Sequence, residues 1–142
     1  MAKRADNPPH TILLVEDEPQ VRRVTKRILS SDSVRILTTG TGARALQIAE
    51  RTAVDLVILD VKLPDVDGTE VLRRLHDIDA DVAVIMVTGY GSAGSVRAAM
   101  ELGAFDYLTK PFSNEEMSRV VREALASRRV GPIRHAVSLT HD

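Results

Sequence analysis

Short apolar runs alternate along the chain with longer segments in which apolar residues recur every three or four positions. The runs cover residues 12–15, 34–37, 56–59, 82–87 and, more weakly, 105–108. Continuous runs of this length are typical of strands buried on both faces, whereas the spacing of three and four is typical of helices with one buried face. The pattern therefore predicts five strands, each followed by a helix.

Each predicted helix carries its apolar residues on one face. They are Val21, Val24, Ile28 and Leu29 in the first helix, Ala45, Leu46 and Ala49 in the second, Val71, Leu72 and Leu75 in the third, Val96, Ala99 and Met100 in the fourth, and Met117, Val120, Val121, Ala124 and Leu125 in the fifth. Strands and helices that alternate in this way are joined by right-handed crossovers. They predict a single α/β domain with a doubly wound, five-stranded parallel sheet.

Signals at the helix ends agree with this prediction. Pro19 suits the first turn of the first helix, and Ser113 with Glu116 predicts a capping box ahead of the last one. Gly131-Pro132 predicts the end of the last helix.

Composition narrows the possible functions. The chain of 142 residues is 44% apolar and 27% charged, which fits one globular domain. Its net charge of -1 gives no general attraction to nucleic acid or to an anionic membrane, and no apolar run is long enough to span a bilayer. The absence of Cys excludes disulfides, thiolate zinc sites and Cys nucleophiles. We expect a cytoplasmic protein that neither binds nucleic acid directly nor enters a membrane.

Polar residues gather where the predicted strands end. The first strand leads into Glu16 and Asp17, the third ends at Asp60, the fourth at Thr88, and the fifth runs into Lys110. The carboxyl ends of parallel strands meet at one edge of the sheet, where α/β proteins bind their ligands.

This set of residues has a definite chemistry. Three carboxylates that converge repel one another and need a cation, and oxygen ligands without His or Cys favour Mg²⁺. A carboxylate can also act as a nucleophile and form an aspartyl phosphate. Lys110 and the Thr88 hydroxyl would then supply a positive charge and a hydrogen bond to the phosphoryl oxygens. The sequence thus predicts a site for phosphoryl transfer.

Four segments carry a resemblance to a known family. They are residues 12–19 (ILLVEDEP), 60–68 (DVKLPDVDG), 87–89 (VTG) and 106–112 (DYLTKPF). In this order and spacing they resemble the receiver domains of two-component response regulators. The resemblance implies a (βα)5, flavodoxin-like fold with strand order 2-1-3-4-5. It also implies an N-terminal extension over 1–10, a receiver domain over 11–129 and a C-terminal tail or linker over 130–142.

The resemblance assigns a role to each residue of the acidic edge. It implies that Asp60 accepts the phosphoryl group and also binds Mg²⁺, that Asp17 binds the ion directly, and that Glu16 binds it through water. The backbone carbonyl of Lys62 would complete the protein ligands. Lys110 would contact the phosphoryl oxygens.

Three further residues are implied to form the switch. Thr88 would also contact the phosphoryl oxygens, and its movement would let the ring of Tyr107 turn inward. The Lys110-Pro111 peptide bond is expected to be cis, as is usual in this family. The Gly-Tyr-Gly that follows Thr88, where Ala is common, is similar to the receivers of nitrogen-regulation-type transcription activators.

The resemblance also implies partners. The phosphoryl donor would be a sensor histidine kinase or a histidine phosphotransfer protein, and the chain itself would catalyse its phosphorylation and its dephosphorylation without being an enzyme in the usual sense. The phosphorylated fourth helix, fifth strand and fifth helix would dock a partner or form a homodimer. The sequence shows no output domain, so we expect a stand-alone receiver or the receiver part of a transcription regulator.

Three alternatives compete with this interpretation. A haloacid-dehalogenase-like phosphatase would want an acid two residues beyond its nucleophile, where this chain has Lys62. A binding module that is not phosphorylated would not need the whole set of site residues. Residues 89–94 (GYGSAG) fit the G-x-G-x-x-G pattern, but they follow the fourth strand and have no acidic strand end about 20 residues later. We interpret these glycines as giving the loop freedom to move with Thr88.

Overall fold

The computed structural model describes residues 10–31, 33–89 and 93–141. Residues 1–9 of the expected N-terminal extension, and residues 90–92 of the loop interpreted as mobile, lie outside the described residues. Among the described residues, no helix combines the length and the apolar character needed to cross a membrane.

Five parallel strands form one sheet. They are β1 (His10–Val15), β2 (Val34–Thr39), β3 (Leu56–Asp60), β4 (Ala83–Thr88) and β5 (Asp106–Thr109). Their order across the sheet is β2-β1-β3-β4-β5, and every neighbouring pair is parallel. The predicted fold class and strand order are therefore confirmed.

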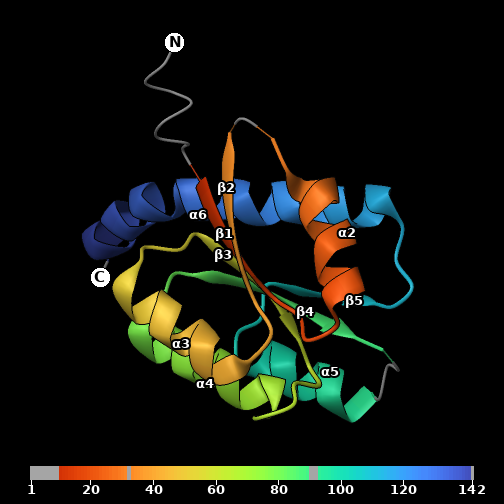
Figure 1. Cartoon of the computed structure of the whole chain (residues 1–142). Coiled ribbons are helices and arrows are strands. Elements are labelled where there is room, and N and C mark those ends of the chain that lie inside the picture. Colours follow the sequence, from red (N-terminus) through yellow and green to blue (C-terminus); the bar gives the residue numbers. More distant parts are fainter. Residues whose placement is uncertain (1–9, 32, 90–92, 142) are drawn as a thin grey trace.

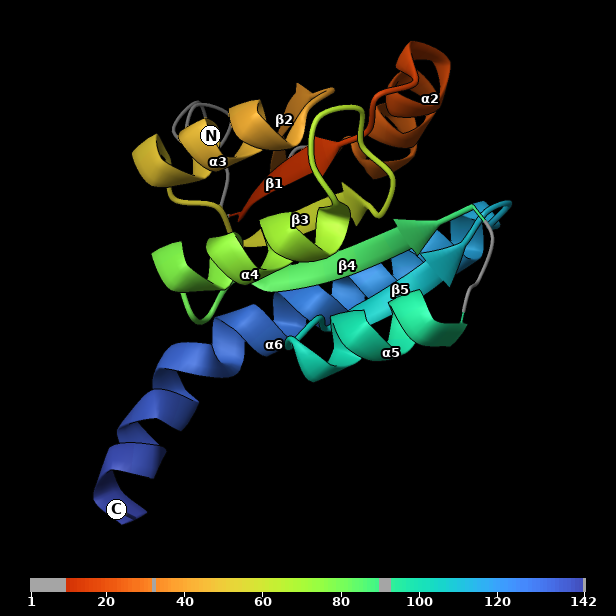
Figure 2. The same ribbon diagram turned by 90° about the horizontal axis from the view of Figure 1, so that it is seen from below.

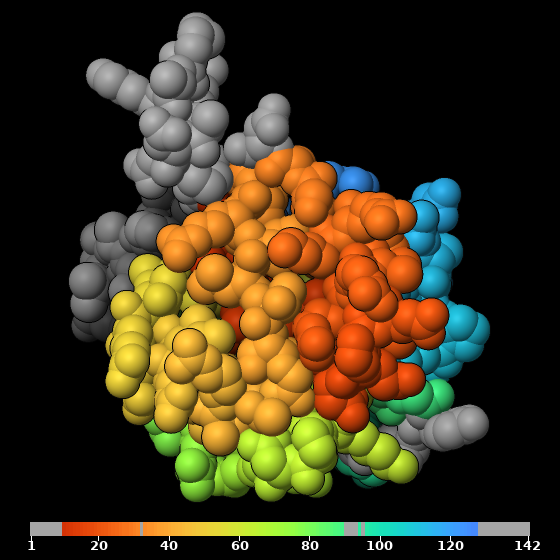
Figure 3. All heavy atoms as spheres, viewed as in Figure 1, coloured from red at the N-terminus to blue at the C-terminus, as the bar shows by residue number. Residues whose placement is uncertain are grey.

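Helices cover both faces of this sheet (Figure 1). The helices are α2 (Pro19–Leu29), α3 (Gly42–Arg51), α4 (Gly68–Ile78), α5 (Ala93–Glu101) and α6 (Asn114–His141). One buried cluster joins α3, α4 and α5 to one face, and a second joins α2 and α6 to the other. In the space-filling view, the atoms of the edge strand β2 lie in front of β1 and cover most of it (Figure 3).

The interior strands explain why their sequences are continuously apolar. Along β3, all five residues are buried, and the first four, residues 56–59, belong alternately to the two clusters. Leu59 belongs to the cluster under α3, α4 and α5, whereas Ile58 belongs to the cluster under α2 and α6. A strand with helices on both faces has no solvent side on which polar residues would be favoured.

Two details differ from the sequence prediction. The sequence pattern predicts Val24 on the buried face of its helix with Leu29, yet it is 58% exposed, because α2 turns Thr25, which is buried, and not Val24 toward the sheet. The predicted end of the last helix at Gly131-Pro132 is wrong, since α6 continues to His141. A proline inside a helix removes one hydrogen bond and can bend the helix without ending it, so Gly131-Pro132 is a weaker stop signal than the sequence prediction assumed. Figure 2 shows these last turns projecting beyond the sheet.

Gly68 lets the chain fold back against the end of β3. A Cβ at this position would lie 2.6 Å from the carbonyl oxygen of Asp60 and 2.7 Å from the Cα of Val61. Both are backbone atoms, which cannot move aside as the tip of a side chain can. The N–H of Gly68 also donates to the carbonyl of Val61 over 2.8 Å.

We therefore expect Gly68→Ala to lower the free energy of unfolding by about 1–3 kcal/mol, the usual cost of forcing extra volume into a closed site. Gly89→Ala is the matched control, because a Cβ at Gly89 would have no atom within 4 Å. Urea denaturation of both variants measures the difference. An equal loss in the two variants would contradict the steric argument.

Candidate functional site

The register of the sheet brings the ends of the central strands together. Val15 pairs with Leu59, and Asp60 pairs with Val87 on the other side. Glu16, which follows Val15, therefore lies beside Asp60 at the same edge. The structure thus confirms that segments 44 residues apart in sequence meet at one edge of the sheet, as the parallel topology predicts.

Three carboxylates form a cluster at this edge. Glu16, Asp17 and Asp60 each place one oxygen within 4.8 Å of the others. Glu16 is 3% exposed and Asp60 6%, whereas Asp17 is open to solvent. Three oxygen donors at this spacing, one of them facing water, fit a hard divalent cation that keeps part of its hydration shell. The residues present therefore suit Mg²⁺.

Lys110, the residue after β5, reaches this cluster. Its Nζ lies 2.9 Å from Oε1 of Glu16, 3.2 Å from Oδ2 of Asp60 and 3.8 Å from Oε1 of Glu18. The Lys110-Pro111 peptide bond is cis, as the sequence analysis expected. One ammonium group therefore serves both buried carboxylates.

Burial and charge shift the protonation of this pair. Burial raises the pKa of Glu16 above its usual value, the neighbouring charge of Asp60 adds to the rise, and the hydrogen bond from Lys110 offsets only part of it. Burial works against the charge of Lys110, but the hydrogen bond to Glu16 and the charge of Asp60 outweigh it, so the pKa of Lys110 is raised. The edge carries more negative charge than Lys110 alone neutralises, which favours a second cation.

The backbone after Asp60 also contacts this carboxylate. The N–H of Lys62 donates to Oδ1 of Asp60 over 3.1 Å, while the Lys62 side chain is exposed. Both oxygens of Asp60 thus have partners: Oδ1 the Lys62 amide and Oδ2 the Lys110 ammonium. These two contacts fix the orientation of the carboxylate.

The expected switch residues lie on the two adjacent strands. Thr88 ends β4 and is 5% exposed, and its register partner is Thr109. Tyr107 lies on β5, pairs with Met86 on β4 and is 41% exposed. In this structure the Tyr107 ring therefore lies toward solvent.

Two contacts that shape the site could not be predicted from the sequence. Arg22 donates from Nη1 to the carbonyl oxygen of Glu16 over 2.6 Å, which holds the loop that carries the acidic pair. Asp65 accepts hydrogen bonds from the first two amides of α3, Gly42 and Ala43. In both contacts a side chain binds a backbone group of another segment. Every residue type has these backbone groups, so the sequence does not show which of them a side chain will bind.

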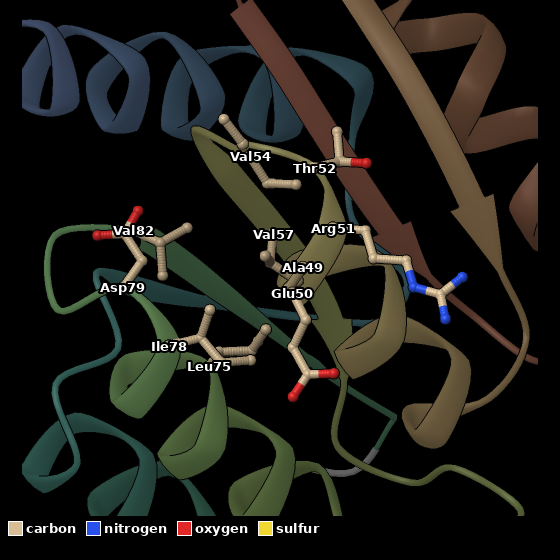
Figure 4. A pocket seen from close by; sticks show the side chains of 11 residues that line it. Ala49, Glu50, Arg51, Thr52, Val54, Val57, Leu75, Ile78, Asp79 and Val82 are labelled. Carbon is tan, nitrogen blue, oxygen red and sulfur yellow. The ribbon is translucent and has the colours of Figure 1, made fainter.

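Two hollows have different relations to the site. One, of about 340 Å³, lies between the C-terminal ends of α3 and α4, with Leu75, Ile78 and Val82 on its wall (Figure 4). It lies at the opposite edge of the sheet from Asp60 and contains none of the site residues. The other, of about 740 Å³, is an apolar groove between α2 and the segment after β5, and Lys110 is part of its lining.

Comparison with known proteins gives a family match over most of the chain. Residues 12–122 match the family described as the response regulator receiver domain. The C4-dicarboxylate transport transcriptional regulatory protein DctD of Pseudomonas aeruginosa is 37% identical over 120 residues, which cover 84% of this chain and 26% of DctD. Sporulation initiation phosphotransferase F of Bacillus subtilis is 33% identical over 114 residues, which cover 80% of this chain and 92% of that protein.

A solved structure gives the same result. The receiver domain of the sensor histidine kinase PA1611 from Pseudomonas aeruginosa, described with a magnesium ion coordinated in its active-site cleft, superimposes with a TM-score of 0.75 at 30% identity. The match covers 82% of this chain and 98% of that one. The chain thus spans a whole receiver domain, but only about a quarter of DctD.

Lys110→Met should destabilise the metal-free protein, because it leaves Glu16 and Asp60 buried without their ammonium partner. We expect the free energy of unfolding to fall by about 1–3 kcal/mol, less than for a fully buried pair because the Lys110 side chain is 23% exposed. Mg²⁺ should reduce the difference in the free energy of unfolding between Lys110→Met and the wild type, because the ion supplies positive charge to the same carboxylates. Thermal unfolding with and without Mg²⁺ measures both effects, with Lys62→Met as an exposed control. A gap that Mg²⁺ leaves unchanged would contradict this electrostatic account.

Proposed function

The chain belongs to the response-regulator receiver domain family, and from this premise we propose that it is a signalling switch that accepts a phosphoryl group on Asp60. The observation that carries the proposal is the setting of Asp60. Its carboxylate is 6% exposed, lies within 4.8 Å of two other carboxylates and is 3.2 Å from the Nζ of Lys110. A nucleophile, a cation site and a fixed positive charge are the parts that phosphoryl transfer needs.

Each residue then has a part in the reaction. Asp17 and Asp60 would hold Mg²⁺ directly, Glu16 through water, and the carbonyl of Lys62 would complete the set. The ion would neutralise the carboxylates and the charge that develops on the phosphoryl oxygens. The magnesium ion described in the active-site cleft of the PA1611 receiver domain supports Mg²⁺ as the ion at this edge.

The transfer itself exchanges one bond to phosphorus for another. An oxygen of Asp60 attacks the phosphorus of a phosphohistidine, the P–N bond breaks, and the leaving imidazole nitrogen keeps the electron pair and takes up a proton. Lys110 and the hydroxyl of Thr88 would then contact the phosphoryl oxygens. Hydrolysis of the acyl phosphate later returns Asp60 to a carboxylate.

The groove beside Lys110 is a suitable place for the protein donor. It is lined by Val21, Val24 and Ile28 on α2 and by Pro111 and Phe112 after β5. Val24 is 58% exposed in this lining, so its side chain is open to a partner. A sensor histidine kinase or a histidine phosphotransfer protein docked in this groove would bring its phosphohistidine to the edge that carries Asp60.

The output surface would lie on the other side of Thr88. Met100, Leu102 and Tyr107, on and next to α5 and β5, are each more than a third exposed. Movement of Thr88 toward the phosphoryl group would change the space available to the Tyr107 ring and with it this surface, which would bind a partner or a second copy of the chain. Relatives such as DctD are named as transcriptional regulatory proteins, which supports regulation of transcription as the output.

The assignment of the nucleophile is tested by phosphorylation with acetyl phosphate. We expect the wild type to gain the mass of one phosphoryl group only when Mg²⁺ is present, and Asp60→Asn to gain none, because the amide is not a nucleophile. Intact-mass spectrometry measures both. A phosphate on Asp60→Asn under the same conditions would refute the assignment.

The groove is tested separately. Val24→Glu should slow phosphoryl transfer from a phosphorylated sensor kinase at least tenfold, since a charge would be buried in an apolar contact. Phosphorylation by acetyl phosphate, which needs no docking, should change little. Ile78→Glu is the matched control, because Ile78 is 39% exposed on α4 and lies outside the groove. Equal effects of the two variants on kinase transfer would rule out the groove as the docking site.

A further inference from the structure

The loop between β3 and α4, residues 61–67, is joined to α3 by a carboxylate. Oδ1 of Asp65 accepts from the N–H of Gly42 over 3.0 Å, and Oδ2 accepts from the N–H of Ala43 over 2.9 Å. The two amides belong to the first turn of α3, where N–H groups have no partner within the helix. Their hydrogen bonds, that of Ala43 first, lower the pKa of Asp65, so it is charged at neutral pH.

Close packing accompanies these hydrogen bonds. A Cβ at Gly42 would overlap Cγ1 of Val66 and would lie 2.7 Å from Cγ2 of Val71. Leu63 and Val66, on either side of Asp65, pack against the core under α3 and α4. Only glycine at position 42 lets the helix come this close to the loop. The α3 side of the loop is therefore held by the hydrogen bonds of Asp65 and by the close packing of Val66 against Gly42.

The near end of the same loop holds the nucleophile. The N–H of Lys62 donates to Oδ1 of Asp60 over 3.1 Å, and Lys62 forms an isolated bridge with Asp67. The loop thus leaves Asp60, reaches α3 at Asp65 and returns within seven residues. A shift at Asp65 would move Lys62, because few bonds separate the two.

We propose that Asp65 is a positioning residue for the phosphorylation site, which holds the 61–67 loop so that the amide of Lys62 orients Asp60 and its carbonyl faces the Mg²⁺ position. The inference rests on the proposed function, since it concerns the same nucleophile and ion. Asp65 itself touches neither. Groups that orient metal ligands in this indirect way typically change metal affinity 10–100-fold when they are removed.

A role limited to capping α3 would predict something different. Helix α3 already has its own N-cap, Thr41, whose Oγ1 accepts from the N–H of Arg44 over 3.2 Å. Thr41 lies next to the helix in sequence, whereas Asp65 comes from 23 residues beyond Gly42. Thr41→Ala therefore weakens the same helix end but leaves the link to the loop intact. This makes it the matched control.

The experiment compares wild type, Asp65→Ala, Asp65→Asn and Thr41→Ala in the full chain. We expect Asp65→Ala to raise the Mg²⁺ concentration for half-maximal phosphorylation by acetyl phosphate about tenfold, with a smaller change in the rate at saturating Mg²⁺. Asp65→Asn keeps one acceptor oxygen, so its increase should be smaller, and it serves if the alanine variant does not fold. Thr41→Ala should stay within about twofold of the wild type, because its cap stabilises α3 alone.

A second measurement needs no metal and no phosphorylation. Amide hydrogen exchange, followed by NMR in metal-free protein, should be faster at Lys62 in both Asp65 variants and unchanged there in Thr41→Ala. If the Asp65 variants match Thr41→Ala in Mg²⁺ dependence and in exchange at Lys62, Asp65 is only a helix cap and the inference is wrong. If the wild type shows no Mg²⁺-dependent phosphorylation, the proposed function fails and the inference fails with it.

Discussion

Two carboxylates buried side by side set the central constraint on this domain. Glu16 and Asp60 lie at the ends of neighbouring strands, and each would cost several kcal/mol if it were left charged without a partner. Lys110, the residue after β5, forms ion pairs with both carboxylates. In the sheet, β4 separates β5 from β3, the strand that carries Asp60. A lysine suits this position because its flexible stem can pass across the end of β4 while its ammonium group stays at the sheet edge. The strand order therefore matters to the chemistry, since it sets the distance that the cation has to cover.

The same constraint leaves the edge ready for a divalent ion. Lys110 supplies one positive charge to a cluster of three carboxylates, and the pKa of Glu16 is raised first by its burial and then by the charge of Asp60. A divalent ion bound beside Asp17 would balance the negative charge that Lys110 leaves. A phosphoryl group on Asp60 would then bring new negative charge next to Lys110 and the hydroxyl of Thr88, so the phosphorylated state would redistribute contacts that already exist.

The sequence predicts the sheet and the acidic edge well, because both follow from local patterns. Runs of apolar residues mark the strands, and a polar residue that ends such a run, such as Asp60, must lie at the carboxyl edge of a parallel sheet. Other features depend on distances that no local pattern contains. The exposure of Val24 depends on how α2 is rotated against the sheet, which buries Thr25 instead, and the hydrogen bonds of Asp65 depend on how the 61–67 loop meets α3. Asp65 also precedes a helix of its own, α4, so its type and position suggest nothing about a partner on α3.

The contacts around Asp60 suggest why a signal would leave the site through β4. On the side of β1, Arg22 holds the carbonyl of Glu16, and on the side of the 61–67 loop, Asp65 holds the turn to α3. In both contacts one partner of the hydrogen bond is charged, the Arg22 donor in the first and the Asp65 acceptor in the second, and such bonds are stronger than those between neutral groups. On the third side, the carbonyl of Thr88 accepts from the N–H of Lys110 over 2.8 Å, and a Cβ at Gly89 would meet no atom within 4 Å. A phosphoryl group that draws Thr88 toward it would therefore act on β4 and on its neighbour β5, which carries the exposed Tyr107.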